Sequence, residues 1–215
     1  MDIAWHGYSC FRITERGHTS VVTDPFGTKK ALAKMRLNAD LVTVSHDRAG
    51  HGVGDIRGQI YVIAGPGEYE VGELFVTGIA LHHHDDENDR ILDNVAYHFE
   101  YPNALNVLHL GALHHLPDPS IFEQLDQVNV LLLPVETALH NGDQLADLIN
   151  VIEPNYVVPM QPIRQNDADY SLAVDGFLKL MGVSGLEEQD GLRVTPTSLP
   201  EQTQVALLRS NHRSS

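Results

Sequence analysis

"LVTVSHDRAGHGVGD", residues 41–55, runs from an apolar segment into a loop that carries two histidines. The apolar start predicts a buried β-strand, because short apolar runs rich in β-branched residues are typical of strands covered on both faces. His46 and His51 follow, with Arg48 and Gly50 between them. Imidazole is a good zinc ligand, whereas a guanidinium is permanently cationic and glycine has no side-chain donor atom. The stretch therefore combines features of a metal-binding loop with residues that cannot bind metal.

The segments on either side of this stretch predict an α/β fold. Short β-rich runs separated by glycine or charged turn residues dominate the first part, such as "SCFRIT" at 9–14 and "QIYVIA" at 59–64. A helix is expected at 31–40, and the later part alternates strands with helices expected at 142–152 and 170–182. Strands that crowd early and then alternate with helices predict two packed sheets with helices outside.

The helix expected at 170–182 has the clearest pattern. Gly182 is a plausible C-cap, and a rough apolar face is formed by Leu172, Phe177, Leu178 and Met181. No linker rich in serine, glycine or proline divides the chain, so one domain is expected over residues 1–209. Residues 210–215 are expected to form a polar C-terminal tail.

Seven segments, in the same order along the chain, resemble the metallo-β-lactamase superfamily. The resemblance is to its compact metal-dependent hydrolases, a group similar to ascorbate-6-phosphate lactonase. The segments are "AWHGYSCFRI" at 4–13, "VVTDPF" at 21–26, "LVTVSHD" at 41–47, "GPGEYEVG" at 65–72, "LHLGALHHL" at 108–116, "VLLLPV" at 130–135 and "YVVPMQP" at 156–162. The resemblance implies a four-layer αβ/βα sandwich with its site at one edge, fed by loops from both sheets.

The resemblance also implies where metal ligands would stand. Active relatives carry His-x-His-x-Asp-His in the first loop, a further histidine, a bridging aspartate and a last histidine. In this chain His46 and His51 are kept, and a third histidine is kept at His83 or His84, with the register open by one residue. The other four positions are filled by Arg48, Gly50, Ala112 and Gln161.

The side-chain chemistry at these positions predicts a vestigial site and a protein that is not an enzyme. Gly50 and Ala112 have no donor atom, Arg48 cannot bind a cation, and Gln161 keeps only a weak carbonyl ligand. A catalytic zinc needs about three protein ligands plus water, and neither of the family's two metal positions supplies them. We expect no cofactor and a binding or scaffold function. In this hypothesis the Arg48 guanidinium replaces the missing cation, next to a carboxylate such as Asp24 or a small anion.

One alternative is a working hydrolase with a rearranged mononuclear histidine site. It would use zinc or manganese on a lactone, phosphoester or similar ester. Its ligands would come from His46, His51, His83, His84 and His115, with His114 beside them. The run "HHHDDENDR" at 82–90 could likewise form a surface metal site, but a solvated acidic loop is favoured there.

Composition limits the class of partner. The 215 residues carry a net charge of −15 with histidine neutral, which repels phosphate backbones and excludes nucleic acid. No run is long and apolar enough to span a membrane, and no secretory signal is seen. The single cysteine fits a cytoplasmic protein. The expected partners are an unknown protein, a second copy of the chain or a small anion.

Two further residues are expected in the core. Cys10 has no basic neighbour in sequence that would lower its pKa, so we expect a small core residue and not a nucleophile. His109 lies within a predicted buried strand, and we expect a hydrogen-bonded core histidine.

Overall fold

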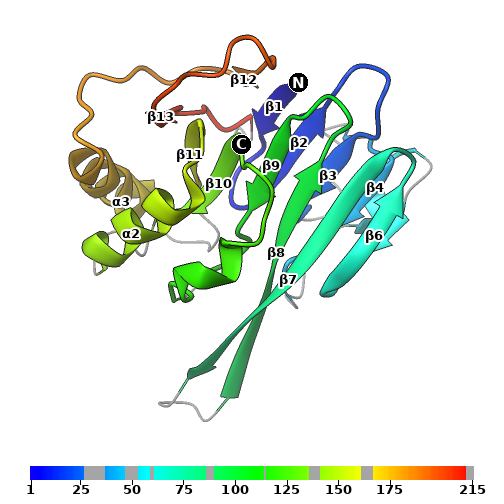
Figure 1. The fold of residues 1–215 in the computed structure, drawn as a ribbon, viewed down its shortest axis with the longest axis horizontal. Helices are drawn as coiled ribbons and strands as arrows, with labels where there is room; N and C mark the ends of the chain where they lie inside the picture. The colour runs from blue at the N-terminus through cyan, green and yellow to red at the C-terminus, as the bar shows by residue number, and fades with distance from the viewer. Residues whose placement is uncertain are drawn as a thin grey trace.

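The computed structural model describes residues 1–26, 37–46, 53–58, 61–85, 90–113, 115–135, 141–160 and 167–211 (Figure 1). For residues 54, 83–85, 90–92 and 167–170 only the backbone is described. The described strands form a six-stranded and a seven-stranded sheet. The six-stranded sheet has the order β12 (Leu192–Arg193), β1 (Asp2–Trp5), β2 (Phe11–Thr14), β3 (Val21–Thr23), β4 (Leu41–Thr43) and β5 (Tyr61–Ile63).

The seven-stranded sheet draws on the middle and the end of the chain. Its order is β13 (Gln204–Val205), β11 (Tyr156–Met160), β10 (Val130–Pro134), β9 (Asn106–His109), β8 (Arg90–Glu100), β7 (Leu74–Asp85) and β6 (Gly67–Val71). Strands β9, β10, β11 and β13 are parallel, whereas β6 to β9 are antiparallel. Both sheets are therefore mixed, with parallel strands beside antiparallel ones.

The described α-helices are few and lie at one end of the seven-stranded sheet (Figure 1). They are α2 (Gly142–Ile152) and α3 (Asp167–Leu180), with 3-10 turns η1 (Val53–Asp55) and η2 (Pro119–Phe122). None of the helices in the described ranges is long and apolar enough to cross a membrane.

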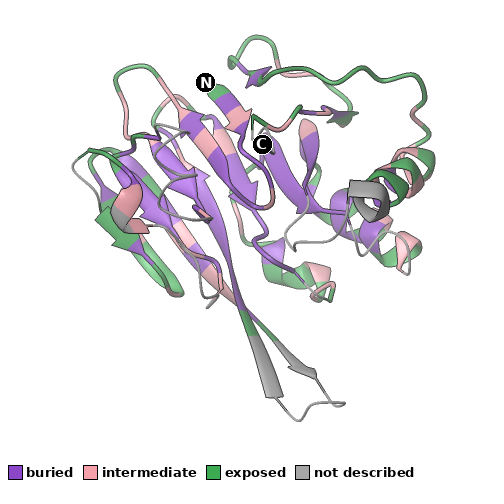
Figure 2. Cartoon of the chain, turned by 180° about the vertical axis from the view of Figure 1, so that it is seen from behind, coloured by how far each residue is buried: buried purple, intermediate pink, exposed green. Residues whose placement is uncertain are grey.

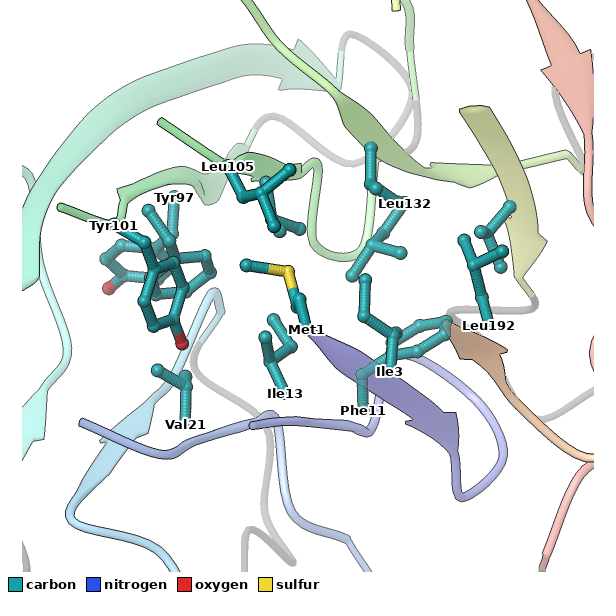
Figure 3. Packing of buried hydrophobic residues seen from close by; sticks show 14 of the residues in the cluster. Met1, Ile3, Phe11, Ile13, Val21, Tyr97, Tyr101, Leu105, Leu132 and Leu192 are labelled. Atoms are coloured by element: carbon teal, nitrogen blue, oxygen red, sulfur yellow. The ribbon is translucent and has the colours of Figure 1, made fainter. Parts of the chain in front are cut away.

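The two sheets pack face to face over an apolar core. Figure 3 shows Ile3, Phe11 and Ile13 from the six-stranded sheet pointing toward Tyr97 and Leu132 from the other. A second apolar cluster joins the outer face of the seven-stranded sheet to α2 and α3, and a third lies outside the six-stranded sheet around Val22 and Val42. These layers confirm the predicted α/β sandwich.

Helix α3 confirms the predicted helix and its end, but the predicted apolar face is partly wrong. The amide of Val183 donates to the Leu178 carbonyl and Gly182 has a φ of 66°, so the helix ends in a left-handed cap. Ala173 and Phe177 are fully buried, whereas Leu172 is 60% exposed. The helix packs through the row that contains Ala173 and Phe177, four residues apart, which points Leu172 to solvent.

Two other predictions, the loop at 82–90 and the helix at 31–40, can be compared with the structure. The expected loop at 82–90 is wrong in part, because His82 to Asp85 and Arg90 belong to the long β7–β8 hairpin; residues 86–89 lie outside the described ranges. His82 faces Asp93 across this hairpin, with 2.6 Å between Nδ1 and Oδ1, so a cross-strand side-chain contact favours extended pairing. The helix expected at 31–40 lies mostly outside the described ranges, and Asn38 forms a strand bridge with Arg57.

We expect the two faces of α3 to differ sharply in their contribution to stability. Phe177→Ala should lower the free energy of unfolding by about 3–5 kcal/mol, because it leaves a cavity under a fully buried side chain. Leu172→Ala, at the exposed position of the same helix, should change it by less than about 0.5 kcal/mol. Chemical denaturation of both variants measures the difference, and equal losses would contradict this packing of α3.

Candidate functional site

The candidate site lies where the ends of strands from both sheets meet. Strands β3 and β4 are parallel, so their carboxyl ends reach the same edge of the six-stranded sheet. Asp24 directly follows β3, and Ser45 and His46 come just after β4. From the other sheet, the Val95 amide donates to the Ser45 carbonyl at 2.7 Å. The loop after β4 is therefore held between the two sheets.

A buried carboxylate is the centre of this site. Asp24 is 1% exposed, and its Oδ1 accepts the Ser45 amide at 2.7 Å while its Oδ2 accepts the Ser45 hydroxyl at 2.6 Å. The Ser45 Oγ also lies 2.8 Å from Nδ1 of His46, and that nitrogen is 4.0 Å from Asp24 Oδ2. Asp24, Ser45 and His46 therefore form one hydrogen-bonded chain.

The chain of hydrogen bonds assigns the protons. The Ser45 hydroxyl donates to Asp24 Oδ2, and this uses its single hydrogen. The Ser45 oxygen then accepts from Nδ1–H of His46. A neutral imidazole with its proton on Nδ1 carries its lone pair on Nε2. The relay through Ser45 thus orients the ring and sets its tautomer.

The backbone at Asp24 is bent into an unusual conformation to make these bonds. Its φ is 38°, in the left-handed region that non-glycine residues seldom adopt, and its amide donates to the Thr43 carbonyl at 2.8 Å. Such a conformation costs on the order of 1–3 kcal/mol and persists only where surrounding bonds hold it. The paired bonds from Ser45 offset that cost.

The side chain of Asn94, on β8, holds the loop that follows β9. Its Nδ2 donates to the Leu110 carbonyl at 2.8 Å, and its Oδ1 accepts the Ala112 amide at 2.9 Å. Gly111 lies between these two bonds with a φ of 67°. A Cβ at Gly111 would stand 2.4 Å from Asn94 Oδ1 and 2.6 Å from Ser45 Cβ. Only glycine allows this close approach of the β9 loop to Ser45.

The negative charge of Asp24 acts on the buried groups around it. Burial raises the pKa of the Cys10 thiol, and the charge of Asp24 raises it further. The same two causes raise the pKa of the Tyr97 hydroxyl, which donates to the Val44 carbonyl at 2.9 Å. Cys10 is thus a protonated thiol in the core, as predicted, and has none of the thiolate character of a nucleophile.

His109 is a hydrogen-bonded core histidine, as predicted. It is fully buried, and its Nε2 lies 3.0 Å from the Ser9 carbonyl. Because a carbonyl only accepts, Nε2 carries the proton. Burial lowers the pKa of His109, although the Asp24 charge and the Ser9 bond oppose the shift. The ring therefore stays neutral near pH 7.

The structure brings together some of the residues predicted for the site. Asp24 and His46 are joined through Ser45, and Ala112, 2% exposed, is tied to the same loop through Asn94. His115 is exposed. The backbones of His83 and His84 lie in β7 opposite Leu92 and Ile91, and their side chains are outside the described set. The predictions for Arg48, Gly50, His51, His114 and Gln161 lie outside the described residues.

The described donors alone do not suit a catalytic metal. Within the described ranges no three His, Cys, Asp or Glu side chains gather closely enough to hold an ion. Both carboxylate oxygens of Asp24 accept hydrogen bonds from Ser45, and Ala112 has no donor atom. A catalytic zinc requires about three protein ligands. Among the described residues, His46 is the imidazole at ion-pair distance from Asp24.

Three residues of the site were missed by sequence reasoning. Ser45 lies directly before His46, after the apolar run at 41–44, and its hydroxyl could have been recognised as a partner of the histidine. Gly111 directly precedes Ala112, the position of the family's bridging aspartate. Its residue type was the available signal, because glycine readily adopts the positive φ that it has here. Asn94 offered no local signal, because its partners Leu110 and Ala112 are 16 and 18 residues away.

Two packed mixed sheets, with loops from both meeting around Asp24, define a metallo-β-lactamase sandwich. A family model described as a beta-lactamase superfamily domain matches residues 2–161. The chain belongs to this family, as the sequence resemblance predicted.

Similar proteins agree with this assignment. A candidate Zn-dependent hydrolase of the metallo-β-lactamase superfamily from Thermotoga maritima is 26% identical, with a TM-score of 0.74 over 96% of this chain and 97% of that one. A UPF0173 protein from Pyrococcus furiosus is 23% identical over 196 residues, which cover 79% of this chain and 87% of the relative. The metallo hydrolase Igni18 from Ignicoccus hospitalis shares the fold at 18% identity, with a TM-score of 0.57 over 89% of this chain and 97% of its own.

We expect Gly111→Ala to be much more destabilising than Gly182→Ala. The two glycines have nearly the same φ, 67° and 66°, but an added Cβ meets Asn94 and Ser45 at Gly111 and no atom within 4 Å at Gly182. Gly182→Ala should cost about 1 kcal/mol through backbone strain alone. Gly111→Ala should cost about 2 kcal/mol more, because side chains of the site must move. Urea denaturation measures both losses, and equal values would contradict the close approach at Gly111.

Proposed function

We propose that this chain is a non-catalytic binding protein that keeps the metallo-β-lactamase fold and has lost the dinuclear metal centre. The site around Asp24 would bind a small anion. The observation that carries the proposal is the state of Asp24: it is buried, and a serine, not a metal ligand set, holds both of its oxygens. The chemistry of Arg48, Gly50 and Ala112, which offer no metal ligand at their positions, supports it.

The buried charge of Asp24 supports a positive role for Arg48. A buried carboxylate is costly without a cation, and hydrogen bonds from a neutral serine compensate only in part. Within the described residues the one side chain at ion-pair distance is His46, at 4.0 Å. In this proposal the Arg48 guanidinium supplies the charge that a metal supplies in active relatives. Its planar donors would also hold the anion in the pocket.

A metal-dependent hydrolase is the second candidate function. The similarity to the candidate Zn-dependent hydrolase of Thermotoga maritima favours it. Here His46 would bind zinc or manganese with His51, with His83 or His84, and with His114 or His115. Such a metal would supply an activated water for attack on a lactone, phosphoester or similar ester. The tautomer set by Ser45 leaves the lone pair of a neutral His46 on Nε2, which suits a ligand.

Metal content separates the two functions. Protein purified without a histidine tag, chelator or added metal should contain far less than one zinc or manganese per chain by elemental analysis, because four of the family's ligand positions lack good ligands. Stoichiometric metal that is lost in His46→Ala, but kept in the control His18→Ala, would overturn the proposal. His18 suits as a control because it pairs with Glu73, away from Asp24.

We expect Arg48→Ala to lower stability and to abolish binding of inorganic phosphate. Removing the cation from a buried pair should cost about 3 kcal/mol. The double variant Arg48→Ala/Asp24→Asn should recover part of that loss, because it no longer buries an unpaired charge. Urea denaturation and calorimetric titration with phosphate measure both effects. Arg209→Ala, which removes an exposed arginine paired with Asp190, is the control. Unchanged stability and phosphate binding in Arg48→Ala would contradict the role of Arg48.

A further inference from the structure

The outer face of the seven-stranded sheet carries a row of acidic and aromatic side chains away from the helices. Cross-strand pairing places Glu70 opposite Phe75 and Phe75 opposite Glu100, in one row over β6, β7 and β8. Glu68 opens the next row on the same face, because it lies two residues from Glu70 on β6. We call Glu68, Glu70, Phe75 and Glu100 the acidic face.

The acidic face belongs to the side of the sheet on which α2 and α3 pack, but those helices do not reach it. In the row next to Glu100, His98 pairs with Leu108, which packs in the cluster with the helices. The helices lie over the β10–β11 end, whereas β6 and β7 form the opposite end of the sheet (Figure 1). Phe75 is 55% exposed, and Figure 2 shows exposed residues, in green, at the β6 end of the sheet. An aromatic side chain thus lies open to solvent among carboxylates.

The carboxylates of the acidic face have no cation among the described residues. Burial and the charges of Asp126 and Glu68 raise the pKa of Glu100. His98 Nδ1 lies 3.0 Å from Glu100 Oε1, but the ring is fully buried, and burial lowers its pKa to about 4. His98 is therefore neutral near pH 7. The ion pairs that arginine forms within the described ranges lie elsewhere, at Asp2, Glu188 and Asp190.

Strand β6 presents an open edge beside these carboxylates. It is the last strand of its sheet, with β7 as its neighbour. Val71 pairs with Leu74 across a two-residue turn, so these two residues exchange both backbone hydrogen bonds, as do Tyr69 and Val76. The alternation points the backbone N–H and C=O groups of Glu68 and Glu70 outward. Among the described residues these groups have no backbone partner.

We propose that the acidic face and the open edge of β6 bind a basic, extended segment of a partner protein. The segment adds to β6 as a further strand through the outward groups of Glu68 and Glu70. Its lysine or arginine side chains lie beside Glu68, Glu70 and Glu100, and their aliphatic stems cover Phe75. This function is independent of the site at Asp24.

Charge identifies the partner as a basic segment and not a second copy of the chain. Each copy carries a net charge of −15, and pairing two β6 edges would bring Glu68 and Glu70 of both copies together. Charges on an edge strand also discourage unspecific pairing. That role explains the glutamates at the edge, but not the half-exposed Phe75 between Glu70 and Glu100. Exposed aromatic residues of this kind are enriched at the centre of interfaces.

The test uses the full chain and a synthetic peptide of alternating lysine and valine. Binding is followed by fluorescence anisotropy, and amide NMR shifts locate it. The peptide should bind with shifts confined to residues 67–77 and 98–100. Glu70→Lys and Phe75→Thr should each weaken it by about tenfold. The control Glu201→Lys, an exposed position in the C-terminal region with the same change of charge, should leave the affinity within about twofold.

Two further measurements distinguish strand addition from general electrostatic attraction of a basic peptide to an acidic protein. The same peptide with its central amide nitrogens methylated keeps its charge but cannot pair, so it should bind at least about tenfold more weakly. Equal binding of both peptides, or equal weakening by Glu70→Lys and Glu201→Lys, would overturn the proposal. Dimerisation of the chain that Glu70→Lys abolishes would also overturn it, in favour of a second copy.

Discussion

The paired hydrogen bonds from Ser45 to the buried carboxylate of Asp24 are the constraint on which the site depends. They join the ends of β3 and β4, hold Asp24 at a φ of 38° and set the tautomer of His46. A buried carboxylate without such partners would cost several kcal/mol. The bonds therefore link two strands, compensate for backbone strain at Asp24 and orient the ring of His46.

The fold around this site is held by contacts within the protein. The sheets, their apolar core and the loops at their edge are held by packing and backbone hydrogen bonds, none of which needs a metal. Asn94 ties Leu110 and Ala112 to β8, so the β9 loop has its place without a bridging aspartate. Side-chain hydrogen bonds from Asp24 and Asn94 therefore satisfy backbone groups of both loops. The two proposed binding functions, for a small anion near Asp24 and for a basic segment at the edge of β6, use different parts of this fold.

Much of the fold followed from local sequence patterns. The apolar run at 41–44 became β4, the segment 142–152 became α2, and Gly182 ended α3 as a left-handed cap. These features depend on residues close in sequence, so periodicity and capping identify them. The exposure of Leu172 and the length of the β7–β8 hairpin did not follow, because packing of the whole helix and pairing between strands determine them.

For the site, the sequence by itself determined which side chains lack ligand chemistry: Arg48, Gly50 and Ala112 cannot bind a metal in any fold. It also placed Asp24 and His46 at strand ends. Only the tertiary structure decided that Ser45 joins them and that Asn94 completes the β9 loop. It alone placed Phe75 between Glu70 and Glu100. Such contacts join residues distant along the chain, and strand register and sheet packing, which no local pattern encodes, bring them together.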